Sequence, residues 1–217
     1  MQEFDKLMML GIIRPSNSPW ASSLHMALKK NGELRPCGDY RALNKQTMAD
    51  RYPIPHIHDF TYSIEDASLF SKIDLVRAYN HIPVAPQDIS KTSVTTPFGL
   101  YEFLRMPFGL TNAAQTFQRF IDQVIRGLPG VYAYIDDLLV ASSTMDEHIQ
   151  QLRQLFARIR DHGISINIEK RESGKGSSQF LGHILTSQCI TRYLQKSIPS
   201  ETIRCPIHRR NYDDFWD

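Results

Sequence analysis

The chain has 217 residues, of which 41% are hydrophobic and 22% are charged. This composition suits one globular unit or two small lobes and excludes a chain that is disordered as a whole. With 25 Lys and Arg against 23 Asp and Glu, the net charge is only +2, so a nucleic acid would have to be held by a local basic surface rather than by overall charge.

Cysteine usage and hydropathy narrow the class further. Cys37, Cys189 and Cys205 are scattered and contain no C-x-x-C pair, which argues against a disulfide framework and a structural zinc site. The N-terminus lacks an apolar signal core, and nowhere do 18 apolar residues run together. We therefore expect an intracellular, cytoplasmic protein with no membrane partner.

The first third of the chain predicts a short helix and a basic hairpin. Residues 3–10 predict a short helix that ends at Gly11, and a loop rich in Pro and Ser follows. Two strand-like runs, 24–29 and 34–38, flank a turn at 30–32. Residues 56–66 predict a further helix.

The middle of the chain predicts alternating strands and helices. A strand over 69–75 is followed by a hairpin made of 91–97 and 100–105. Thr111 or Asn112 can cap a helix that runs to about residue 126. Its apolar stripe is formed by Ala113, Phe117, Phe120, Ile121 and Val124.

A second long helix follows a strand pair at residues 132–142. Thr144 and Glu147 have the spacing of a capping box, and Gly163 ends the helix. The inner face is expected to contain Ile149, Leu152, Leu155, Phe156 and Ile159. Helices on one face of a mainly antiparallel sheet predict an α+β domain.

The stretch YAYIDDLLVAS places Asp136 and Asp137 between two apolar runs. At about 4 Å, two like charges repel by roughly 1 kcal/mol in water and about 4 kcal/mol at an effective dielectric of about 20, so a cation is expected nearby. Mg binds one or two carboxylates and leaves its other positions to phosphates and water. Asp74, at the end of another predicted strand, can add a third carboxylate, and such a cluster could hold two metal ions for nucleotide polymerisation. The alternative for an isolated Asp-Asp pair is a solvated turn.

Six stretches resemble, in order, the polymerase domain of reverse transcriptases from gypsy-type LTR retrotransposons. They are GIIRPSNSPWASSLHMALKKNGELRPCGDYRALNK, DRYPIPHI, FSKIDLVRAYNHIPV, KTSVTTPFGLYEFLRMPFGLTNAAQTFQRFID, YAYIDDLLVAS and FLGHILTS. The resemblance implies an RNA-directed DNA polymerase that uses two Mg ions, with Mn as an alternative. The implied partners are deoxynucleoside triphosphates and an RNA or DNA template with a primer, and the protein would be particle-associated in an intact element.

The resemblance also implies the fold, which is the fingers and palm of a right-hand polymerase. The palm of that family is ferredoxin-like, with a mainly antiparallel sheet. We expect the N-terminal part of the fingers over 1–66 and palm over 67–90. A hairpin and bend between fingers and palm is expected over 91–110, and palm again over 111–187.

The same resemblance assigns a catalytic centre. Asp74, Asp136 and Asp137 are implied as the catalytic metal ligands. Tyr79 is implied as an aromatic gate, whose ring would lie under the sugar of the incoming nucleotide and exclude a 2′-hydroxyl. Without the resemblance, packing in the core would be the favoured interpretation of Tyr79.

Nucleotide-binding residues are implied in the basic hairpin. Lys29 or Lys30, together with Arg35, match the groups that hold the triphosphate, and turn length leaves the choice of lysine open. Without the resemblance these residues would be surface charges. Trp20 and Tyr52 are expected to pack the fingers.

Contacts to template and nucleotide are implied on either side of the hairpins. Arg41 would touch the template backbone, and Asp39 would orient neighbouring groups. Pro107, Phe108 and Gly109 match a bend beside template and nucleotide, where Gly109 permits close backbone approach. A helix that begins at residue 111 could need the same bend for structural reasons.

Two other functions stay open from the sequence. One is a non-catalytic remnant that retains at most nucleic-acid binding, because the family's thumb, RNase H and integrase are not recognisable. The other is an RNA-dependent RNA polymerase, which shares paired aspartates on a hairpin but would normally need a small residue in place of Tyr79.

The resemblance ends after residue 190. Reading one base earlier permits P-L-P-x-K-V over Thr191–Ser197 and K-L-R-R-F-L-G over Asn211–Asp217, and both strings resemble the continuation of the family. We therefore expect residues 188–217 to be an aberrant, poorly ordered tail that results from a frameshift near residue 191.

Sequencing of the transcript tests the frameshift. The expected result is a shift of one base near codon 191, downstream of which the other frame encodes the continuation of the family. An intact in-frame continuation past that codon would show the hypothesis to be mistaken.

Overall fold

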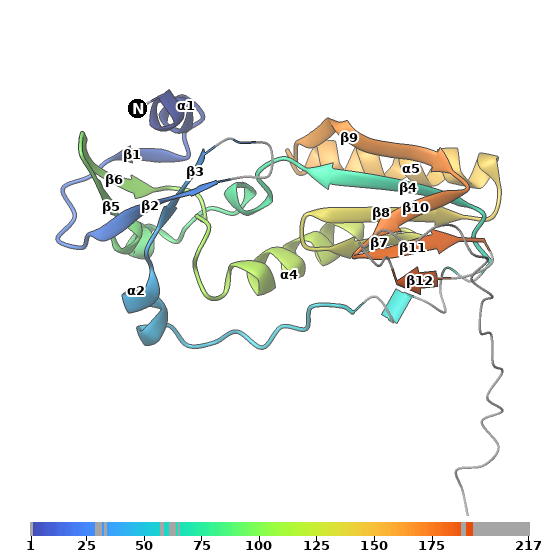
Figure 1. The fold of residues 1–217 in the computed structure, drawn as a ribbon, viewed down its shortest axis with the longest axis horizontal. Coiled ribbons are helices and arrows are strands. Elements are labelled where there is room, and N and C mark those ends of the chain that lie inside the picture. Colours follow the sequence, from blue (N-terminus) through green and yellow to red (C-terminus); the bar gives the residue numbers. More distant parts are fainter. Residues whose placement is uncertain are drawn as a thin grey trace, which may run out of the picture.

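The computed structural model describes residues 2–28, 32, 34–56, 59, 60, 64, 66–187 and 190–192. These residues form two halves that lie side by side along the long axis of the molecule, each built around a sheet (Figure 1). The turn predicted at 30–32 and the helix predicted over 56–66 lie largely outside the described residues, as does most of the tail expected over 188–217.

The first half is a five-stranded sheet in the order β1-β6-β5-β2-β3. Its strands are β1 (Ile13–Pro15), β2 (Ser22–Leu28), β3 (Leu34–Gly38), β5 (Val94–Thr96) and β6 (Gly99–Phe103). The pairing of β2 with β5 is parallel, whereas the others are antiparallel. Helix α1 (Gln2–Met9) buries Phe4 and Leu7 in a core shared with Val94 and Phe103, and α2 (Arg41–Gln46) follows β3.

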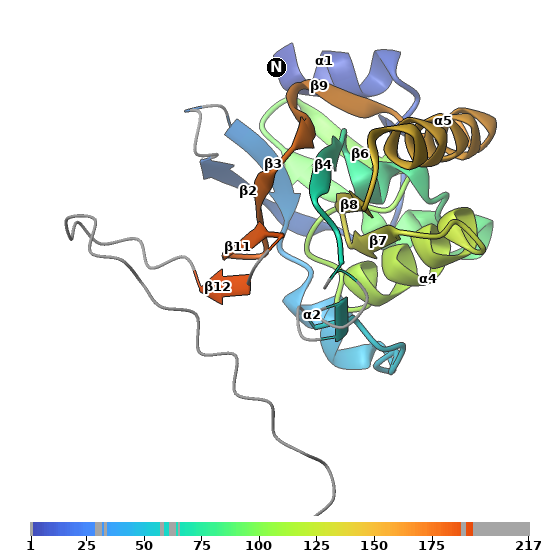
Figure 2. The ribbon, with the colours of Figure 1, turned by 90° about the vertical axis from the view of Figure 1, so that its right-hand side faces the viewer.

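The second half centres on a four-stranded antiparallel sheet in the order β7-β8-β4-β9. Its strands are β4 (Leu69–Leu75), β7 (Val131–Tyr134), β8 (Asp137–Ser142) and β9 (Ile166–Lys175). Helices α4 (Ala113–Ile125) and α5 (Met145–Asp161) cover one face of this sheet (Figure 2). This arrangement confirms the predicted α+β class with a mainly antiparallel sheet.

A small sheet covers the opposite face. It is formed by β10 (Ser177–Phe180), β11 (His183–Thr186) and β12 (Ile190–Arg192). Phe180 and Leu185 pack on Leu139 there, while Leu138 and Val140 point to the helices. Strand β8 is therefore buried on both faces, which explains why its sequence is continuously apolar rather than alternating.

The chain passes from one half to the other and back between β4 and α4. Two 3-10 helices, η2 (Ala78–His81) and η3 (Pro86–Thr92), lead from β4 to the β5–β6 hairpin of the five-stranded sheet. A bend after β6 returns the chain to α4. Among the described residues, no helix combines the length and the apolar character needed to cross a bilayer.

Two local predictions are wrong. The hairpin strand expected to begin at residue 91 begins at Val94, because Pro86 opens a 3-10 helix that extends to Thr92. On α5, the expected inner-face residue Ile149 is 41% exposed, and His148 and Gln151 are buried instead. The predicted cap at Thr144 is confirmed by the hydrogen bond from the Glu147 amide to Thr144 Oγ1 at 3.3 Å, whereas the Glu147 carboxylate accepts from the Ser143 amide at 3.1 Å rather than from Thr144.

A buried polar network explains why His148 and Gln151, rather than Ile149, are buried on α5. His148 is 1% exposed, with Nε2 2.6 Å from Ser71 Oγ on β4 and Nδ1 2.7 Å from Ser142 Oγ on β8. Ser142 also donates to Gln151 Oε1, and the amide of Gly174 donates to Ser71 Oγ at 2.9 Å. Because unpaired polar groups are costly in a core, the serines of the sheet require polar partners on the helix.

The network predicts a pH dependence of stability. Burial lowers the pKa of His148, and the charge of Glu147 opposes this only in part. Below about pH 6.5 the unfolded chain then binds more protons than the folded chain, so the free energy of unfolding falls as pH drops from about 7.5 to about 5.5. We expect a smaller slope in His148→Gln, measured by urea unfolding across this range.

The slope does not vanish in this variant, because burial also lowers the pKa of His81. Equal slopes in the wild type and in His148→Gln would contradict the assignment of a neutral His148.

Candidate active site

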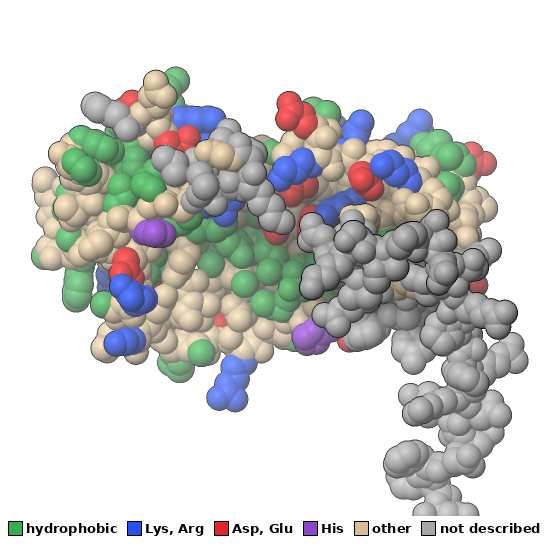
Figure 3. Space-filling view, in the orientation of Figure 1, with side chains coloured by type: hydrophobic (Ala, Val, Ile, Leu, Met, Phe, Trp, Pro, Cys, Tyr) green, Lys and Arg blue, Asp and Glu red, His purple; other side chains and the backbone are tan. Residues whose placement is uncertain are grey.

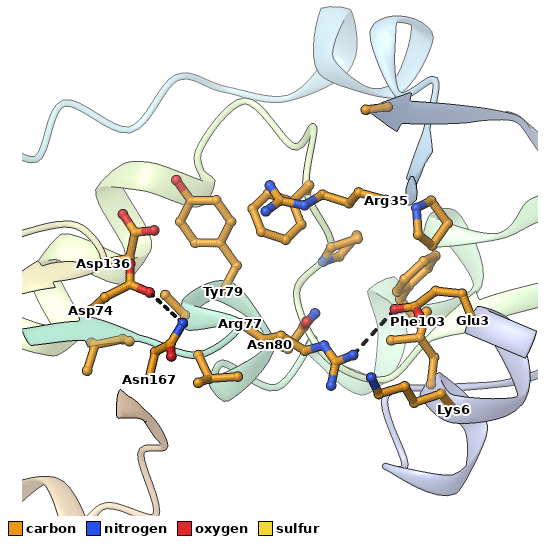
Figure 4. A pocket seen from close by; sticks show the side chains of 18 of the residues that line it. Glu3, Lys6, Arg35, Asp74, Arg77, Tyr79, Asn80, Phe103, Asp136 and Asn167 are labelled. Atoms are coloured by element: carbon orange, nitrogen blue, oxygen red, sulfur yellow. Dashed lines mark hydrogen bonds and ion pairs between the residues drawn. The ribbon is translucent and has the colours of Figure 1, made fainter. Parts of the chain in front are cut away.

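Neighbouring strands bring the three predicted carboxylates together. Asp74 on β4 lies directly opposite Asp137 on β8, and Asp136 occupies the turn between β7 and β8. The amide of Leu75 donates to the carbonyl oxygen of Asp136 at 2.9 Å, which ties this turn to the end of β4. Asp74 and Asp136 line one cavity of about 780 Å³ between the two halves (Figure 4), whereas Asp137 does not line it.

Cationic side chains compensate two of these charges. Lys170 Nζ lies 3.3 Å from Asp74 Oδ2, to which Asn167 also donates at 3.2 Å. Lys72 Nζ lies 3.1 Å from Asp137 Oδ1. In the part of the chain that the structure describes, Asp136 has no ion-pair partner.

Among the described carboxyl groups, Asp136 is the one whose pKa is raised. Desolvation is the main cause, and the charges of Asp137 and Asp74 add to it. The backbone amide of Asp136 and the charge of Arg35 oppose this rise in pKa. The Asp136 side chain is also exposed to solvent. Crowded carboxylates with a raised pKa are typical of functional sites, and a bound cation would stabilise the ionised form.

A buried glutamine holds the turn that carries Asp136. Ile135 in this turn has a φ of 51°, a left-handed conformation that β-branched residues rarely adopt. Gln118 of α4 is fully buried, accepts a hydrogen bond from the Ile135 amide at 2.8 Å and donates to the carbonyl of Ala133 at 3.1 Å. The sequence analysis missed Gln118, although a polar residue beside an apolar stripe was a usable signal.

An aromatic wall stands beside the carboxylates. The ring centroid of Tyr79 lies 4.9 Å from that of Phe108 and 5.9 Å from that of Phe117. The guanidinium of Arg35 lies 4.0 Å from the Phe108 centroid, a cation–π contact. Burial, and then the charge of Asp136, raises the pKa of Tyr79, which keeps its phenol neutral. The predicted nucleotide-binding residues Arg35, Tyr79 and Phe108 thus line the same cavity as Asp74 and Asp136.

The bend after β6 is fixed from α2. Asn44 donates to the carbonyl of Gly109 at 2.8 Å and accepts from the Thr111 amide at 2.9 Å. Gly109 has a φ of 96°, and an added Cβ would lie 3.3 Å from the carbonyl oxygen of Gly38. Glycine is therefore required by the backbone at this position. Pro107 of the same bend lines the cavity.

The remaining predicted contacts lie outside the cavity. The Arg41 side chain is 86% exposed, and its Nε donates to Asp39 Oδ1 at 2.8 Å. The hydrogen bonds from Arg41 lower the pKa of Asp39 to about 2. Asp39 therefore orients the guanidinium on the surface. Lys29 and Lys30 lie outside the described residues.

Trp20 and Tyr52 do not pack the first half as expected. Trp20 is 59% exposed. Tyr52 lies in an extended segment that runs along α4 (Figure 1), where its hydroxyl donates to Asp122 at 2.7 Å and its ring receives the guanidinium of Arg119 at 4.7 Å. The extended segment therefore straps the first half to the helix layer of the second.

Two carboxylates, rather than three, face the space where a metal would bind. Within the described residues, no group of three or more His, Cys, Asp or Glu side chains is arranged to hold a metal ion, and Asp137 is engaged by Lys72. Asp74 and Asp136 still fit Mg, because this ion commonly takes one or two carboxylates and completes its shell with phosphates and water.

The surface beside the cavity is of mixed charge. Figure 3 shows Lys and Arg side chains interspersed with Asp and Glu over β9 and β4, rather than as one continuous basic stripe. This distribution agrees with the small net charge of +2. Any polyanion held here would be bound by local contacts.

Comparison with known proteins identifies the family. Residues 27–185 match the family described as "Reverse transcriptase (RNA-dependent DNA polymerase)". The chain belongs to the reverse transcriptase family. This confirms the family inferred from the sequence motifs.

Curated reverse transcriptase relatives are much longer than this chain. It is 40% identical over 196 residues to "Retrovirus-related Pol polyprotein from transposon opus" of Drosophila melanogaster, a match that covers 87% of the chain and 20% of the relative. The corresponding polyprotein from transposon gypsy of the same organism is 36% identical over 192 residues, with 85% and 19% covered. The chain thus spans about a fifth of the length of these relatives.

Solved reverse transcriptase structures share the fold. A foamy viral protease-reverse transcriptase in complex with double-stranded DNA has a TM-score of 0.81 at 23% identity, covering 86% of this chain and 33% of that one. The same foamy viral protein in complex with an RNA/DNA hybrid also has a TM-score of 0.81, at 22% identity, with 88% and 26% covered. This likeness confirms the predicted polymerase fold.

The hydrogen bonds between Gln118 and the β7–β8 hairpin predict a specific loss of stability when Gln118 is replaced. Gln118→Leu leaves the Ile135 amide and the Ala133 carbonyl without their side-chain partner, which should lower the free energy of unfolding by about 1–3 kcal/mol in a urea titration. Gln115→Leu on the same helix is the matched control, because Gln115 Oε1 is buried without a hydrogen-bond partner among the described residues. An equal fall in the free energy of unfolding in the two variants would argue against a stabilising role for the Gln118 hydrogen bonds.

Proposed function

We propose that this chain is the RNA-directed DNA polymerase domain of a retrotransposon polyprotein, which adds deoxynucleotides to a primer 3′-hydroxyl. One observation carries the proposal. Asp74 at the end of β4 and Asp136 in the β7–β8 turn face the same cavity as Tyr79 and Arg35. Carboxylates for a divalent cation, an aromatic surface and a guanidinium are the groups that a metal-bound nucleoside triphosphate requires.

The carboxylates would hold the metal. Two divalent ions, Mg or Mn, would supply positive charge to the attacking and leaving oxygens of the transfer. Asp74 and Asp136 are the ligands that the cavity offers, and Lys170 neutralises Asp74 until a cation arrives. Because the β7–β8 turn is clamped by Gln118, Asp136 is positioned before substrate binds, which reduces the entropy lost on binding.

The aromatic wall would select the sugar. Tyr79 is packed against Phe108 and Phe117, so its ring has little room to move away from a bulkier sugar. A ribonucleotide would bring its 2′-hydroxyl against this ring. This packing supports a preference for deoxynucleotides over ribonucleotides, and it therefore favours a DNA polymerase over an RNA polymerase. Arg35, which stacks on Phe108, is proposed to contact phosphate.

A primed template is the proposed macromolecular partner. The foamy viral relatives of known structure hold double-stranded DNA and an RNA/DNA hybrid, and the same type of duplex is proposed to lie across the cavity here. Phosphate contacts would supply affinity, while pairing with the template would supply sequence. Arg41 is exposed on the first half and is proposed to contact the template backbone.

Primer extension tests the activity. The chain is incubated with a primed RNA template, Mg and deoxynucleotides, and the wild type is compared with Asp136→Asn. Loss of one metal ligand should lower the rate by about a hundredfold or more. The matched control is Asp161→Asn at the end of α5, where Asp161 is 60% exposed and pairs only with Arg160 among the described residues.

Two outcomes would count against the proposal. Equal extension by the wild type and Asp136→Asn would show that the carboxylate is not a ligand. No extension by the wild type, with duplex binding retained, would support a non-catalytic nucleic-acid-binding remnant.

A further inference from the structure

The cavity extends beyond the carboxylates to helix α1. Its far wall is formed by Glu3 and Lys6 of α1 and by Arg77, which follows β4 (Figure 4). Asp74 and Asp136 lie toward the other end of the same view. One end of the cavity therefore carries two carboxylates and Lys170, whereas the far end carries two cations and one carboxylate.

Arg77 has an unusual backbone conformation. Its φ of 49° and ψ of 47° place it in the left-handed region at the start of η2, which costs free energy for a residue other than glycine. Arg77 lies three residues after Asp74 and two before Tyr79, and its side chain extends within the cavity. Strained residues cluster at binding sites, where the surrounding structure over-determines their conformation.

The ion pair of Arg77 leaves most of its donors unused. Arg77 Nη2 lies 3.3 Å from Glu3 Oε1, and the two side chains are 29% and 33% exposed. A guanidinium has five N–H donors arranged for bidentate contact with carboxylate or phosphate, yet only this one contact involves Arg77 among the described side chains. Lys6 has no ion-pair partner in the described ranges.

We propose that Arg77 and Lys6 bind the terminal phosphates of the incoming deoxynucleoside triphosphate, and that Glu3 holds Arg77 in place until the nucleotide arrives. The inference rests on the proposed polymerase function. The β- and γ-phosphates extend from an α-phosphate that lies at Asp74 and Asp136. In the view of Figure 4, Arg77 lies between these carboxylates and Lys6 of α1.

The charges at the far end fit this ligand. Glu3 leaves a net charge of +1 on the far wall, because Lys6 and Arg77 outnumber it. Phosphate oxygens would replace the single contact with Glu3 by charge-assisted hydrogen bonds from the guanidinium of Arg77 and the ammonium group of Lys6. Since Glu3 competes with phosphate for Arg77, its removal should strengthen binding, whereas removal of Arg77 should weaken it.

Nucleotide binding by the full chain tests the proposal. Isothermal titration calorimetry with Mg measures the affinity for dTTP and for dTMP, which lacks the terminal phosphates. Arg77→Gln should weaken dTTP binding about tenfold or more and leave dTMP binding unchanged. Glu3→Gln should strengthen dTTP binding about two- to fivefold, a gain that misfolding cannot produce.

Arg14→Gln is the matched control. Like Arg77, Arg14 pairs with a glutamate, Glu102 at 2.7 Å, but Arg14 lies outside the cavity. Its substitution should leave dTTP affinity unchanged. An unchanged dTTP affinity in Arg77→Gln, or an equal loss for dTTP and dTMP, would overturn the phosphate contact, and unchanged or weaker binding in Glu3→Gln would overturn the holding role of Glu3.

Primer extension by the wild type, run in parallel, separates the two proposals. A wild type that binds dTTP through Arg77 but extends no primer supports the phosphate subsite and contradicts the polymerase activity. A wild type that extends primer, but whose dTTP affinity is insensitive to Arg77→Gln, supports the activity and contradicts the subsite. A wild type without dTTP binding contradicts the subsite.

Discussion

The site depends on the repulsion among carboxylates that two adjacent strands force together. Asp74 and Asp137 face each other across β4 and β8, and Asp136 lies in the turn that precedes β8. Like charges directly opposite on a sheet are destabilising. Lys72 and Lys170 offset the charges of Asp137 and Asp74, and no ion pair joins Asp136 to another of the described residues. Desolvation, to which the neighbouring carboxylates add, raises the pKa of Asp136, so a bound cation would stabilise its ionised form.

The surrounding layers make this unfavourable arrangement persist. Strand β8 is enclosed by α4 and α5 on one side and by β10 and β11 on the other, so the hairpin cannot shift without exposing core residues. The buried carboxamide of Gln118 then fixes the strained turn. Burial of apolar area thus supplies the stability that the carboxylates reduce, as is common where function requires strain.

Local patterns account for what could be predicted. The strand at 69–75, the cap at Thr144 and the Asp136–Asp137 hairpin each depend on residues close in sequence. The misses depend on distant partners. Ile149 loses the inner face of α5 because Ser71 requires His148, and the pair of Glu3 with Arg77 joins residues 74 positions apart. The partner of Asp137 depends on how β8 pairs with β4, two strands that are distant in sequence.

The five-stranded sheet is assembled from discontinuous pieces of the chain, since β5 and β6 arrive only after β4 has been built into the other sheet. The strands of each large sheet pair only among themselves, but the chain passes between the halves three times, so no single cut in the backbone would release one half from the other. Their cores are expected to form cooperatively, with the parallel β2–β5 pairing as a late, entropically demanding step. The same connectivity limits how the two halves can move around the cavity. Three connections join the halves, namely the extended segment along α4, the segment with η2 and η3, and the bend at Gly109. All three must flex together.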